Sequence, residues 1–540
     1  MKRFVCALAA VLLLCGACMA EDFYIKVYPT AENGEAIIND VPFSENWQVN
    51  DNNRVFYEIF VGSFSDSNGD GIGDLRGIIN RMDYLNDGDP ENGLSLGVEG
   101  LWLTPIFTSP SYHKYDVADY YEIDPQFGTM EDLKELIALC HERDVKIILD
   151  LPINHTSTQC RWFINFSNAH LMQNPRNIYY DYYTWLDAGQ AIPAGRHFAR
   201  VPGRELLYEA NFSDSMPELN FDNEAVRKLV LDVAMYYLDL GVDGFRFDAA
   251  KYIYYGDHKR SVDFWDWYIG EMRKVKPDVY TVAEVWDGDG IIDQYLPVTN
   301  CFHFTASQTA GIIAETAKEG DVNRFTAYIE KYQNHIREKS DGAMNMMFIA
   351  NHDMDRAAGY LTMASGRAHV AASLYLLSPG SPFIYYGEEI GILGSRGGAN
   401  TDANRRLAML WGDGDTVQNP EGSTYKKQST YTVQDLDGMS ASLLNHYKQL
   451  IMIRKANPEI ARGEYHALPF KGTKVGGFTA SWNGGTVAVV HNTTEKDLTV
   501  DLLQATDLPF RQITAVAGMG QAWLEGTKLT ISAQTSVVLR

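Results

Sequence analysis

The chain has 540 residues and a formal net charge of -24, which would repel phosphate backbones and anionic lipid surfaces and so excludes nucleic acid as a partner. Its 45% hydrophobic and 21% charged residues are typical of a globular protein, and its length allows roughly two to four domains of about 150 residues. The aromatic share of 12% suits either sugar stacking or large hydrophobic cores.

The first twenty residues predict an export signal. A basic start is followed by an apolar run from Phe4 to Leu14 and then by small residues up to Ala20, which is too short for a spanning helix. Cleavage after Ala20 is one route. Lipidation at Cys18 is the other, although a lipoprotein signal normally has leucine where Cys15 stands. We therefore expect an extracellular protein, either secreted or anchored to the cell surface.

Three cysteines remain after the signal: Cys140, Cys160 and Cys301. None of them forms a CxxC pair, so at most one disulfide is possible and no zinc site is expected.

The first expected strand, Arg54–Val61, runs into a loop in which oxygen-bearing side chains recur at alternate positions from Asp66 to Asp74. This spacing resembles a calcium loop, because glycines between hard oxygen ligands let the backbone fold round a cation. The twelfth position is Gly77 instead of glutamate, which excludes an EF-hand. The alternative is a turn rich in Asp and Asn without a metal.

Short apolar strands then alternate with helical stretches along the chain. One such helix has Leu133, Leu136, Ile137 and Cys140 on one face, and Asn223 is expected to cap another that ends at Gly241. The expected strands after the first are Gly97–Pro105, Val145–His155, one within Gly241–Tyr252, Asp278–Trp286, a weak one at Cys301–Phe304, Asn345–Asp353 and Pro382–Gly387.

Eight parallel βα units predict a closed (β/α)8 TIM barrel of the α/β class. Periodicity fades between residues 156 and 216, which indicates an inserted loop domain after the third strand. Beyond residue 457 the pattern changes to alternating strands and turn pairs, which indicates a C-terminal antiparallel β-sandwich domain (457–540). The barrel is then expected to comprise residues 21–155 and 217–456.

The fourth strand delivers charge to one face, because Arg246 and Asp248 point one way and Phe245 and Phe247 the other. A neighbouring guanidinium is expected to lower the pKa of Asp248, as suits a charged nucleophile. The active site of such a barrel forms at the carboxyl ends of its strands. By that rule Asp248, Glu284 and Asp353 converge on one mouth, where they form either a reaction site or a metal site.

Four stretches resemble the sequence signatures of the α-amylase superfamily, glycoside hydrolase family 13, in the order expected for that family. They are Asp150-Leu-Pro-Ile-Asn-His155, Gly244-Phe-Arg-Phe-Asp248, Ala283-Glu-Val-Trp286 and Asn351-His-Asp353. Met216-Pro-Glu-Leu-Asn220 is similar to a fifth signature, in the form found in the neopullulanase-like and intermediate α-amylase groups.

The resemblance implies a retaining double displacement at α-glucosidic bonds, with Asp248 as nucleophile, Glu284 as acid and base, and Asp353 as the residue that holds sugar hydroxyls. It also implies two further sets of residues. The sugar-binding residues would be His113, Tyr115, His155, Arg246, Lys251 and His352. The Ca²⁺ ligands would be Asp66, Asn68, Asp70, the Ile72 carbonyl and Asp74.

Two departures from the family pattern bear on specificity. Tyr252 replaces a histidine that is common at its position in α-amylases, which leaves the balance of hydrolysis against transfer open. The run Tyr112-His-Lys-Tyr-Asp116 lacks the aspartate that caps the pocket of family α-glucosidases, which favours an open cleft for long chains.

We therefore expect a monomeric α-amylase that hydrolyses internal α-1,4 bonds of starch or maltodextrins. The alternatives are an α-glucosidase, a neopullulanase or a 4-α-glucanotransferase of the same family. A non-catalytic glycan-binding relative is disfavoured, because all three acids are present.

Overall fold

A computed structural model describes residues 22–24, 41–44, 46–399, 401–429 and 431–540. The expected signal at residues 1–20, including Cys15 and Cys18, lies outside this part of the chain. Across the described ranges, no helix is both long and apolar enough to cross a membrane.

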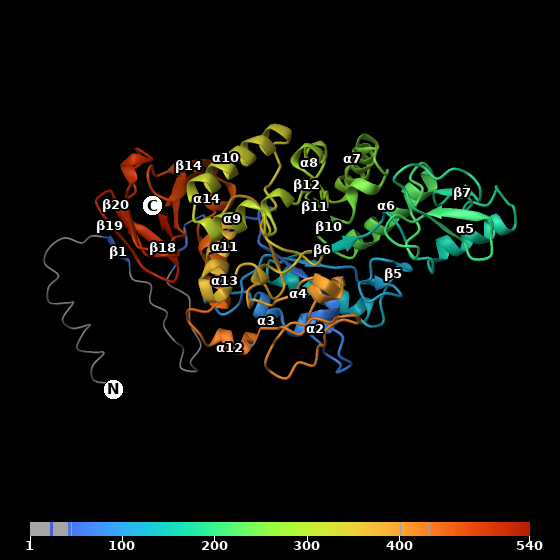
Figure 1. The fold of residues 1–540 in the computed structure, drawn as a ribbon, viewed down its shortest axis with the longest axis horizontal. Helices are drawn as coiled ribbons and strands as arrows, with labels where there is room; N and C mark the ends of the chain where they lie inside the picture. The colour runs from blue at the N-terminus through green and yellow to red at the C-terminus, as the bar shows by residue number, and fades with distance from the viewer. Residues whose placement is uncertain (1–21, 25–40, 45, 400, 430) are drawn as a thin grey trace.

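A parallel sheet forms the centre of the molecule (Figure 1). Every neighbouring pair of its strands is parallel, and strands β2, β3, β6, β10 and β11 are almost entirely buried, as expected when both faces of a sheet are covered. In spatial order the strands are β12 (Asn300–Cys301), β11 (Tyr280–Ala283), β10 (Gly244–Phe247), β6 (Lys146–Leu151), β3 (Gly100–Leu103), β2 (Phe56–Ile59) and β13 (Phe383–Tyr385).

The expected seventh strand, Asn345–Asp353, does not form as a regular strand. Its first residues nevertheless close the barrel, because the Met346 carbonyl accepts from the His303 N–H (3.0 Å) and the Met347 carbonyl from the Phe383 N–H (2.8 Å). The prediction failed because the backbone turns at Asn351, whose side chain accepts from the Asp353 N–H (3.0 Å). The structure is thus a TIM barrel whose seventh segment is irregular.

Helices cover the barrel, and local sequence explains where several of them begin. Thr129 and Asp132 form a reciprocal capping box at the start of α4, and Asn223 caps α6 by accepting from the Ala225 N–H (2.9 Å). The helices are α2 (Leu75–Asn80), α3 (Met82–Leu85), α4 (Met130–Glu142), α6 (Glu224–Asp239), α7 (His258–Val275), α8 (Asp289–Tyr295), α9 (Ile312–Glu319), α10 (Val322–Lys339), α11 (Arg367–Leu376), α12 (Val433–Asp437), α13 (Leu443–Ala456) and α14 (Glu459–Arg462).

Two small sheets lie in the connections after the second and third barrel strands. One pairs β4 (Phe107–Thr108) with β5 (Asp119–Ile123). The other belongs to the segment between β6 and α6, which carries α5 (Arg161–Leu171) and three antiparallel strands, in the order β7 (Trp185–Asp187), β9 (Leu206–Glu209) and β8 (Phe198–Arg200). A backbone bridge between His155 and Glu218 ties the two ends of this segment together beside the barrel mouth.

The C-terminal region is a β-sandwich with an apolar core of its own, which includes Phe470, Val490, Leu524 and Val537. The sandwich (red) and the segment with α5 and β7 lie at opposite ends of the molecule, with the barrel between them (Figure 1). One sheet has the order β14 (Glu464–Pro469), β15 (Gly476–Trp482), β16 (Gly485–Asn492), β21 (Thr535–Leu539) and β18 (Ile513–Gly518). The other has the order β1 (Asp22–Tyr24), β19 (Ala522–Glu525), β20 (Lys528–Ile531) and β17 (Leu498–Asp501).

The cysteines of the described residues, Cys140, Cys160 and Cys301, are buried and free.

Candidate active site

The end of β10 brings charge to the barrel mouth in the way that strand alternation predicts. Phe247 points outward and stacks on Trp265 of α7, with ring centroids 4.4 Å apart, whereas Arg246 and Asp248 face the interior. The next residue, Ala249, has a left-handed backbone (φ 47°), which costs a residue with a Cβ atom about 1–2 kcal/mol. Its N–H donates to Glu284 (2.9 Å), so this backbone conformation joins the ends of β10 and β11.

Arg246 holds three carboxyl groups. Its Nη1 atom lies 2.7 Å from an oxygen of Asp150 and 2.7 Å from an oxygen of Asp248, and its Nη2 atom lies 3.0 Å from Glu284. The guanidinium is almost wholly buried, so these contacts are little screened by water. Asp248 and Glu284 therefore lie on one rim, bound to the two terminal nitrogens of the same guanidinium.

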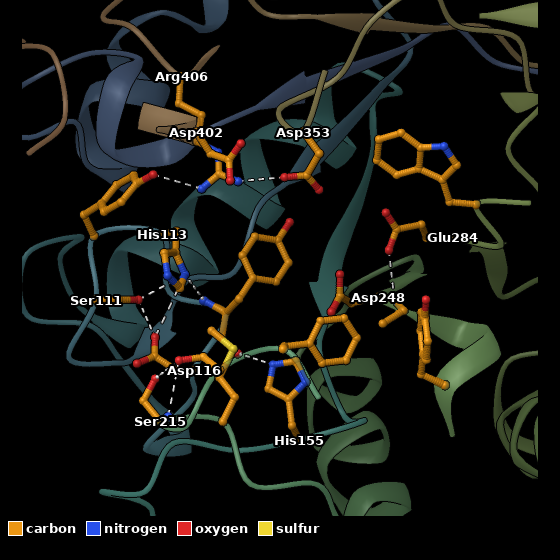
Figure 2. A pocket seen from close by; sticks show the side chains of 18 of the residues that line it. Ser111, His113, Asp116, His155, Ser215, Asp248, Glu284, Asp353, Asp402 and Arg406 are labelled. Carbon is orange, nitrogen blue, oxygen red and sulfur yellow. Dashed lines mark hydrogen bonds and ion pairs between the residues drawn. The ribbon is translucent and has the colours of Figure 1, made fainter. Parts of the chain in front are cut away.

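Asp353 faces the same space from the irregular seventh segment. One of its oxygens lies 2.7 Å from Arg406 and the other lies 3.1 Å from His352. Figure 2 shows the carboxyl groups of Asp248, Glu284 and Asp353 around one side of a pocket, with Arg406 near Asp353 and His155 across from them. The pocket is a cleft of about 720 Å³, and all three acids line it.

The three acids have different protonation behaviour. Burial raises the pKa of Asp248 to about 6, because it outweighs the opposing charge of Arg246 and is reinforced by the nearby carboxylates. Burial likewise raises the pKa of Glu284. The pKa of Asp353 is held well below its usual value, since the charges of His352 and Arg406 exceed the effect of burial.

The directions of these pKa shifts correct one expectation from the sequence and agree with another. Arg246 contacts Asp248 but does not bring its pKa below the ordinary value, because desolvation in the barrel mouth is the larger effect. Asp248 is nevertheless mostly ionised at pH 7 if its pKa is about 6. The raised pKa of Glu284 suits a group that must carry a proton.

Tyr115 forms one wall of the cleft. Its ring is stacked on His352, with centroids 5.4 Å apart and an interplanar angle of 14°, and its hydroxyl donates to Asp150 (2.8 Å). A ring fixed in this way presents an apolar surface to the cleft.

Two histidines line the cleft as well, and both are neutral. Burial lowers the pKa of His155 to about 4 and that of His113, together with the charge of Arg406, to about 4. Neutral imidazoles suit hydrogen bonds to sugar hydroxyls, because each has one donor and one acceptor nitrogen.

Lys251 reaches the cleft from the turn after β10. Its ammonium group donates to the carbonyl of Trp286 (2.7 Å) and to Asp287 (2.9 Å). The predicted catalytic and sugar-binding positions thus gather at one place, and of them Arg246 and His352 are buried beneath the cleft.

Several residues of the site were not singled out from the sequence. Arg406 lies well beyond the last barrel strand, β13, in a stretch without periodicity, and no signal in the local sequence points to it. Glu58 is a lone acid inside an apolar strand, which is a visible anomaly. Phe212 and Trp286 are 45% and 41% exposed at the cleft, and Trp286 stacks on Phe304.

The expected calcium loop is folded by its own side chains. Asp66 accepts from the N–H groups of Asn68 (3.0 Å), Gly69 and Gly71 (2.7 Å each), and Asp70 accepts from the Ile72 N–H (2.8 Å). Asp74 differs from Asp66 and Asp70 in being buried, and both of its oxygens are hydrogen-bonded.

Asp74 caps α2 through the Gly77 N–H (2.6 Å) and also accepts from Ser67. In the described part of the chain, no three His, Cys, Asp or Glu side chains converge as a metal site would require. A calcium ion in this loop would therefore need amide and carbonyl oxygens, such as those of Asn68 and Ile72, beside one or two carboxylates.

Comparison with known proteins gives matches that span most of the chain. Residues 58–463 match the family model described as "Alpha amylase, catalytic domain". Alpha-amylase 3 of Dictyoglomus thermophilum is 36% identical over 464 residues, which cover 83% of this chain and 86% of that protein. A 4-alpha-glucanotransferase of Thermotoga neapolitana is 29% identical over 452 residues, which cover 81% and 95%. Among solved structures, Eubacterium rectale Amy13B superposes with a TM-score of 0.82 at 33% identity, covering 93% of this chain and 97% of that one.

Proposed function

The chain belongs to the α-amylase family, glycoside hydrolase family 13, and on this premise we propose that it hydrolyses internal α-1,4-glucosidic bonds of starch or maltodextrins with retention of configuration. The observation that carries the proposal is the attachment of Asp248 and Glu284 to one guanidinium, with Asp353 on the same side of the cleft.

In the first step, an oxygen of Asp248 attacks the anomeric carbon and forms a glycosyl ester. Glu284 donates its proton to the departing glycosidic oxygen, so the bond between that oxygen and the anomeric carbon breaks and a free sugar hydroxyl leaves. The raised pKa of Glu284 keeps this proton available, and Asp248 is ionised above a pH of about 6.

In the second step, Glu284, now a carboxylate, takes a proton from water. The resulting hydroxide oxygen attacks the anomeric carbon, the ester bond breaks, and Asp248 is regenerated as a carboxylate. Two displacements restore the original configuration. Retention requires the two carboxyl groups to lie about 5 Å apart, and their shared bonds to Arg246 support such a spacing.

Asp353 and the Tyr115 ring hold the sugar whose bond is cleaved. Asp353 stays ionised and faces the cleft beside Arg406, so it accepts from sugar hydroxyls and opposes the positive charge that develops on the ring. His113, His155 and Lys251 supply further hydrogen bonds, and Arg246 and His352 act on the sugar site from beneath it.

Side chains on two flanks support action within a chain. In Figure 2 Asp402 lies beside Asp353 and Arg406 at one end of the cleft, and His155 lies at the other end, where Phe212 packs against it with ring centroids 5.2 Å apart. Trp286 adds an exposed ring beside Glu284. A long α-glucan would thus contact the protein on both sides of the bond that is cleaved.

One observation favours glucanotransferase activity as a second candidate. Phe212 packs edge-on against Tyr252, with centroids 5.2 Å apart, and both line the cleft near Lys251. Such an apolar surface can hold an acceptor sugar where water would otherwise enter. Transfer would yield products longer than the substrate.

The test uses maltoheptaose and amylose as substrates. Internal cleavage gives several maltooligosaccharides at once, and NMR of the first products shows the α-anomer. Glucose and maltohexaose as the only early products from maltoheptaose would contradict internal cleavage in favour of chain-end trimming, and chains longer than maltoheptaose would favour transfer.

Two variants separate the roles of the acids. We expect Asp248→Asn to abolish turnover of every substrate. Glu284→Gln should lose about 10²–10⁴-fold on maltoheptaose but much less on an activated aryl maltoside, whose leaving group needs no proton. Asp214→Asn, in an exposed pair with His197, should keep the activity of the parent. Full turnover by Asp248→Asn would overturn the assignment of the nucleophile.

We further propose that the protein is exported by the signal at residues 1–20, acts as a monomer, and takes up one structural Ca²⁺ in the loop from Asp66 to Asp74. The basic and apolar pattern of residues 1–20 supports export, by cleavage after Ala20 or lipidation at Cys18. The clustered oxygens of Asp66, Asn68, Asp70 and the Ile72 carbonyl support the metal.

A further inference from the structure

A carboxylate at the centre of the barrel has no part in the mechanism above. Glu58 lies on β2 between Tyr57 and Ile59, and its side chain is only 2% exposed. A buried carboxylate is costly unless it is paired, so its partner is informative. One of its oxygens lies 2.5 Å from Nδ1 of His352 and also accepts from the His352 backbone N–H at 3.3 Å.

The other side of His352 faces the cleft. Its Nε2 atom lies 2.7 Å from the hydroxyl of Tyr115 and 3.1 Å from an oxygen of Asp353. The Tyr115 hydroxyl already donates to Asp150, so towards His352 it acts as an acceptor. Both ring nitrogens of His352 thus face acceptors, and both must carry protons to use them.

The groups around His352 come from seven parts of the chain and include both signs of charge. The titratable and charged side chains that face it or its partners are Glu58 on β2, Tyr115 after β4, Asp150 on β6, Arg246 and Asp248 at β10, Tyr385 on β13, Asp353 and Arg406. Burial alone would lower the pKa of His352, but Asp353 and Glu58 outweigh it and raise that pKa to about 10.

We propose that Glu58 is a positioning residue for this reaction: its carboxylate holds His352 doubly protonated, with Nε2–H directed at Asp353 and the Tyr115 hydroxyl. The proposal rests on the proposed function. By keeping His352 protonated, Glu58 maintains part of the positive charge that keeps Asp353 ionised. It also orients the His352 ring, on which Tyr115 stacks. It does not touch the sugar.

The decisive variant is Glu58→Gln. A glutamine oxygen can still accept from Nδ1–H, so the ring keeps its orientation, but the negative charge is gone. We expect kcat on maltoheptaose to fall about 10 to 100-fold, by analogy with carboxylates that orient metal-bound histidines, with KM changed less than threefold. The alkaline limb of the kcat profile, which deprotonation of Glu284 sets in the parent, should move to lower pH, because His352 in the variant loses its proton before Glu284 does and Asp353 then loses a cationic partner.

Glu389→Gln is the matched control. Glu389 is also buried, but it is hydrogen-bonded to the hydroxyls of Tyr57 (2.7 Å) and Tyr84 (2.6 Å) and not to His352. The control should keep the alkaline limb of the parent. Glu58→Asp retains the charge and should keep that limb as well, with a lower kcat.

The second readout does not depend on activity. In protein with ¹⁵N-labelled histidine, the signal missing from His352→Gln identifies residue 352. We expect it to remain that of an imidazolium from pH 5 to 9 in the parent and in Glu58→Asp, and to titrate within that range in Glu58→Gln.

The outcomes separate the two proposals. A parent without activity on α-glucans, but with the expected NMR behaviour, would refute the proposed function alone. An active parent whose Glu58→Gln variant matches Glu389→Gln in both readouts would refute the role of Glu58. If Glu58→Gln does not fold, titration of the His352 signal between pH 5 and 9 in Glu58→Asp would refute that role too.

Discussion

Arg246 is one buried cation that faces three carboxyl groups, those of Asp150, Asp248 and Glu284. One positive charge cannot offset the desolvation of three negative ones, so burial raises the pKa of each of the three acids despite this contact. Asp353 differs because it has two cations of its own, His352 and Arg406. The number of cations per carboxyl group thus separates the roles of chemically similar residues.

The same effect acts on Glu388, away from the cleft. One of its oxygens accepts from the hydroxyls of Tyr375 (2.7 Å) and Tyr447 (2.6 Å), and its other oxygen has no hydrogen-bond partner among the described residues. Burial raises its pKa to about 8 from an ordinary value of 4.5. The folded state therefore binds a proton that the unfolded state releases.

We expect Glu388→Gln to change how stability depends on pH. Between about pH 4.5 and 8 the folded parent holds more protons than the unfolded chain, so its free energy of unfolding falls as pH rises. The glutamine of the variant cannot titrate, so the free energy of unfolding of the variant does not fall in this way. It should exceed that of the parent by on the order of a few kcal/mol at pH 8 and by little at pH 4.5. Urea denaturation at pH 5, 6.5 and 8 measures the difference.

Glu131→Gln is the control for this measurement, because its side chain is 80% exposed. It should track the parent at every pH. A difference between Glu388→Gln and the parent that stays constant from pH 5 to 8 would contradict a shifted Glu388.

Single elements determine which side chains enter the cleft. In β10 the alternation of the strand sends Arg246 inward and Phe247 outward, and the left-handed Ala249 redirects the backbone towards β11. The loop from Asp66 to Asp74 is shaped by its side chains instead, since its carboxylates accept hydrogen bonds from backbone N–H groups of the same loop. A cation bound by the loop would relieve the repulsion between these acids.

We expect calcium removal to lower the thermal unfolding midpoint by several degrees. A ligand that binds only the folded state at 100 times its Kd stabilises it by about 2.7 kcal/mol. Scanning calorimetry with EGTA, and then with added Ca²⁺ or Mg²⁺, measures the effect, and Ca²⁺ alone should restore the midpoint.

Asp70→Ala should remove the response to EGTA. Asp89→Ala, in another acidic turn where Asp89 accepts from the Glu91 N–H (3.0 Å), should retain it. A parent whose midpoint is the same with EGTA and with Ca²⁺ would contradict a calcium site in this loop.

At the scale of the whole molecule, the barrel and the C-terminal sandwich share hydrogen bonds. Asn323 of α10 accepts from the Phe470 N–H (3.0 Å) and donates to the Thr473 carbonyl (2.9 Å) in the turn between β14 and β15. Arg540 at the end of β21 forms two 2.9 Å contacts with Glu459 of α14. These contacts couple the sandwich to the helices that cover the barrel.

We expect Asn323→Ala to lower the free energy of unfolding by about 1–3 kcal/mol, because it leaves a backbone donor and a backbone acceptor without partners. Guanidinium denaturation followed by tryptophan fluorescence and far-UV circular dichroism measures it. Lys331→Ala, on the exposed face of the same helix, should change the midpoint little. Equal stability of Asn323→Ala and the parent would show that the two regions do not depend on this junction.

Much of the fold and the site could be predicted from local sequence. Strand alternation placed Arg246 and Asp248 on one face, and the rule that barrel sites form at the carboxyl ends of strands brought Asp248, Glu284 and Asp353 together, as the structure confirms. These predictions succeed because the period of a strand and the direction of a βα unit are properties of short segments.

Other features of the site depend on packing between segments that are distant in the chain, and only the tertiary structure revealed them. It brought Glu58 and Arg406 to His352 and Asp353 from positions about 300 and 50 residues away in the chain. It replaced the expected seventh strand with an irregular segment, held by backbone hydrogen bonds at Met346 and Met347, and a turn, and it raised the pKa of Asp248 where the sequence predicted a lowered one. Burial and contacts between distant segments set these features, and neither is encoded in the spacing of neighbouring residues.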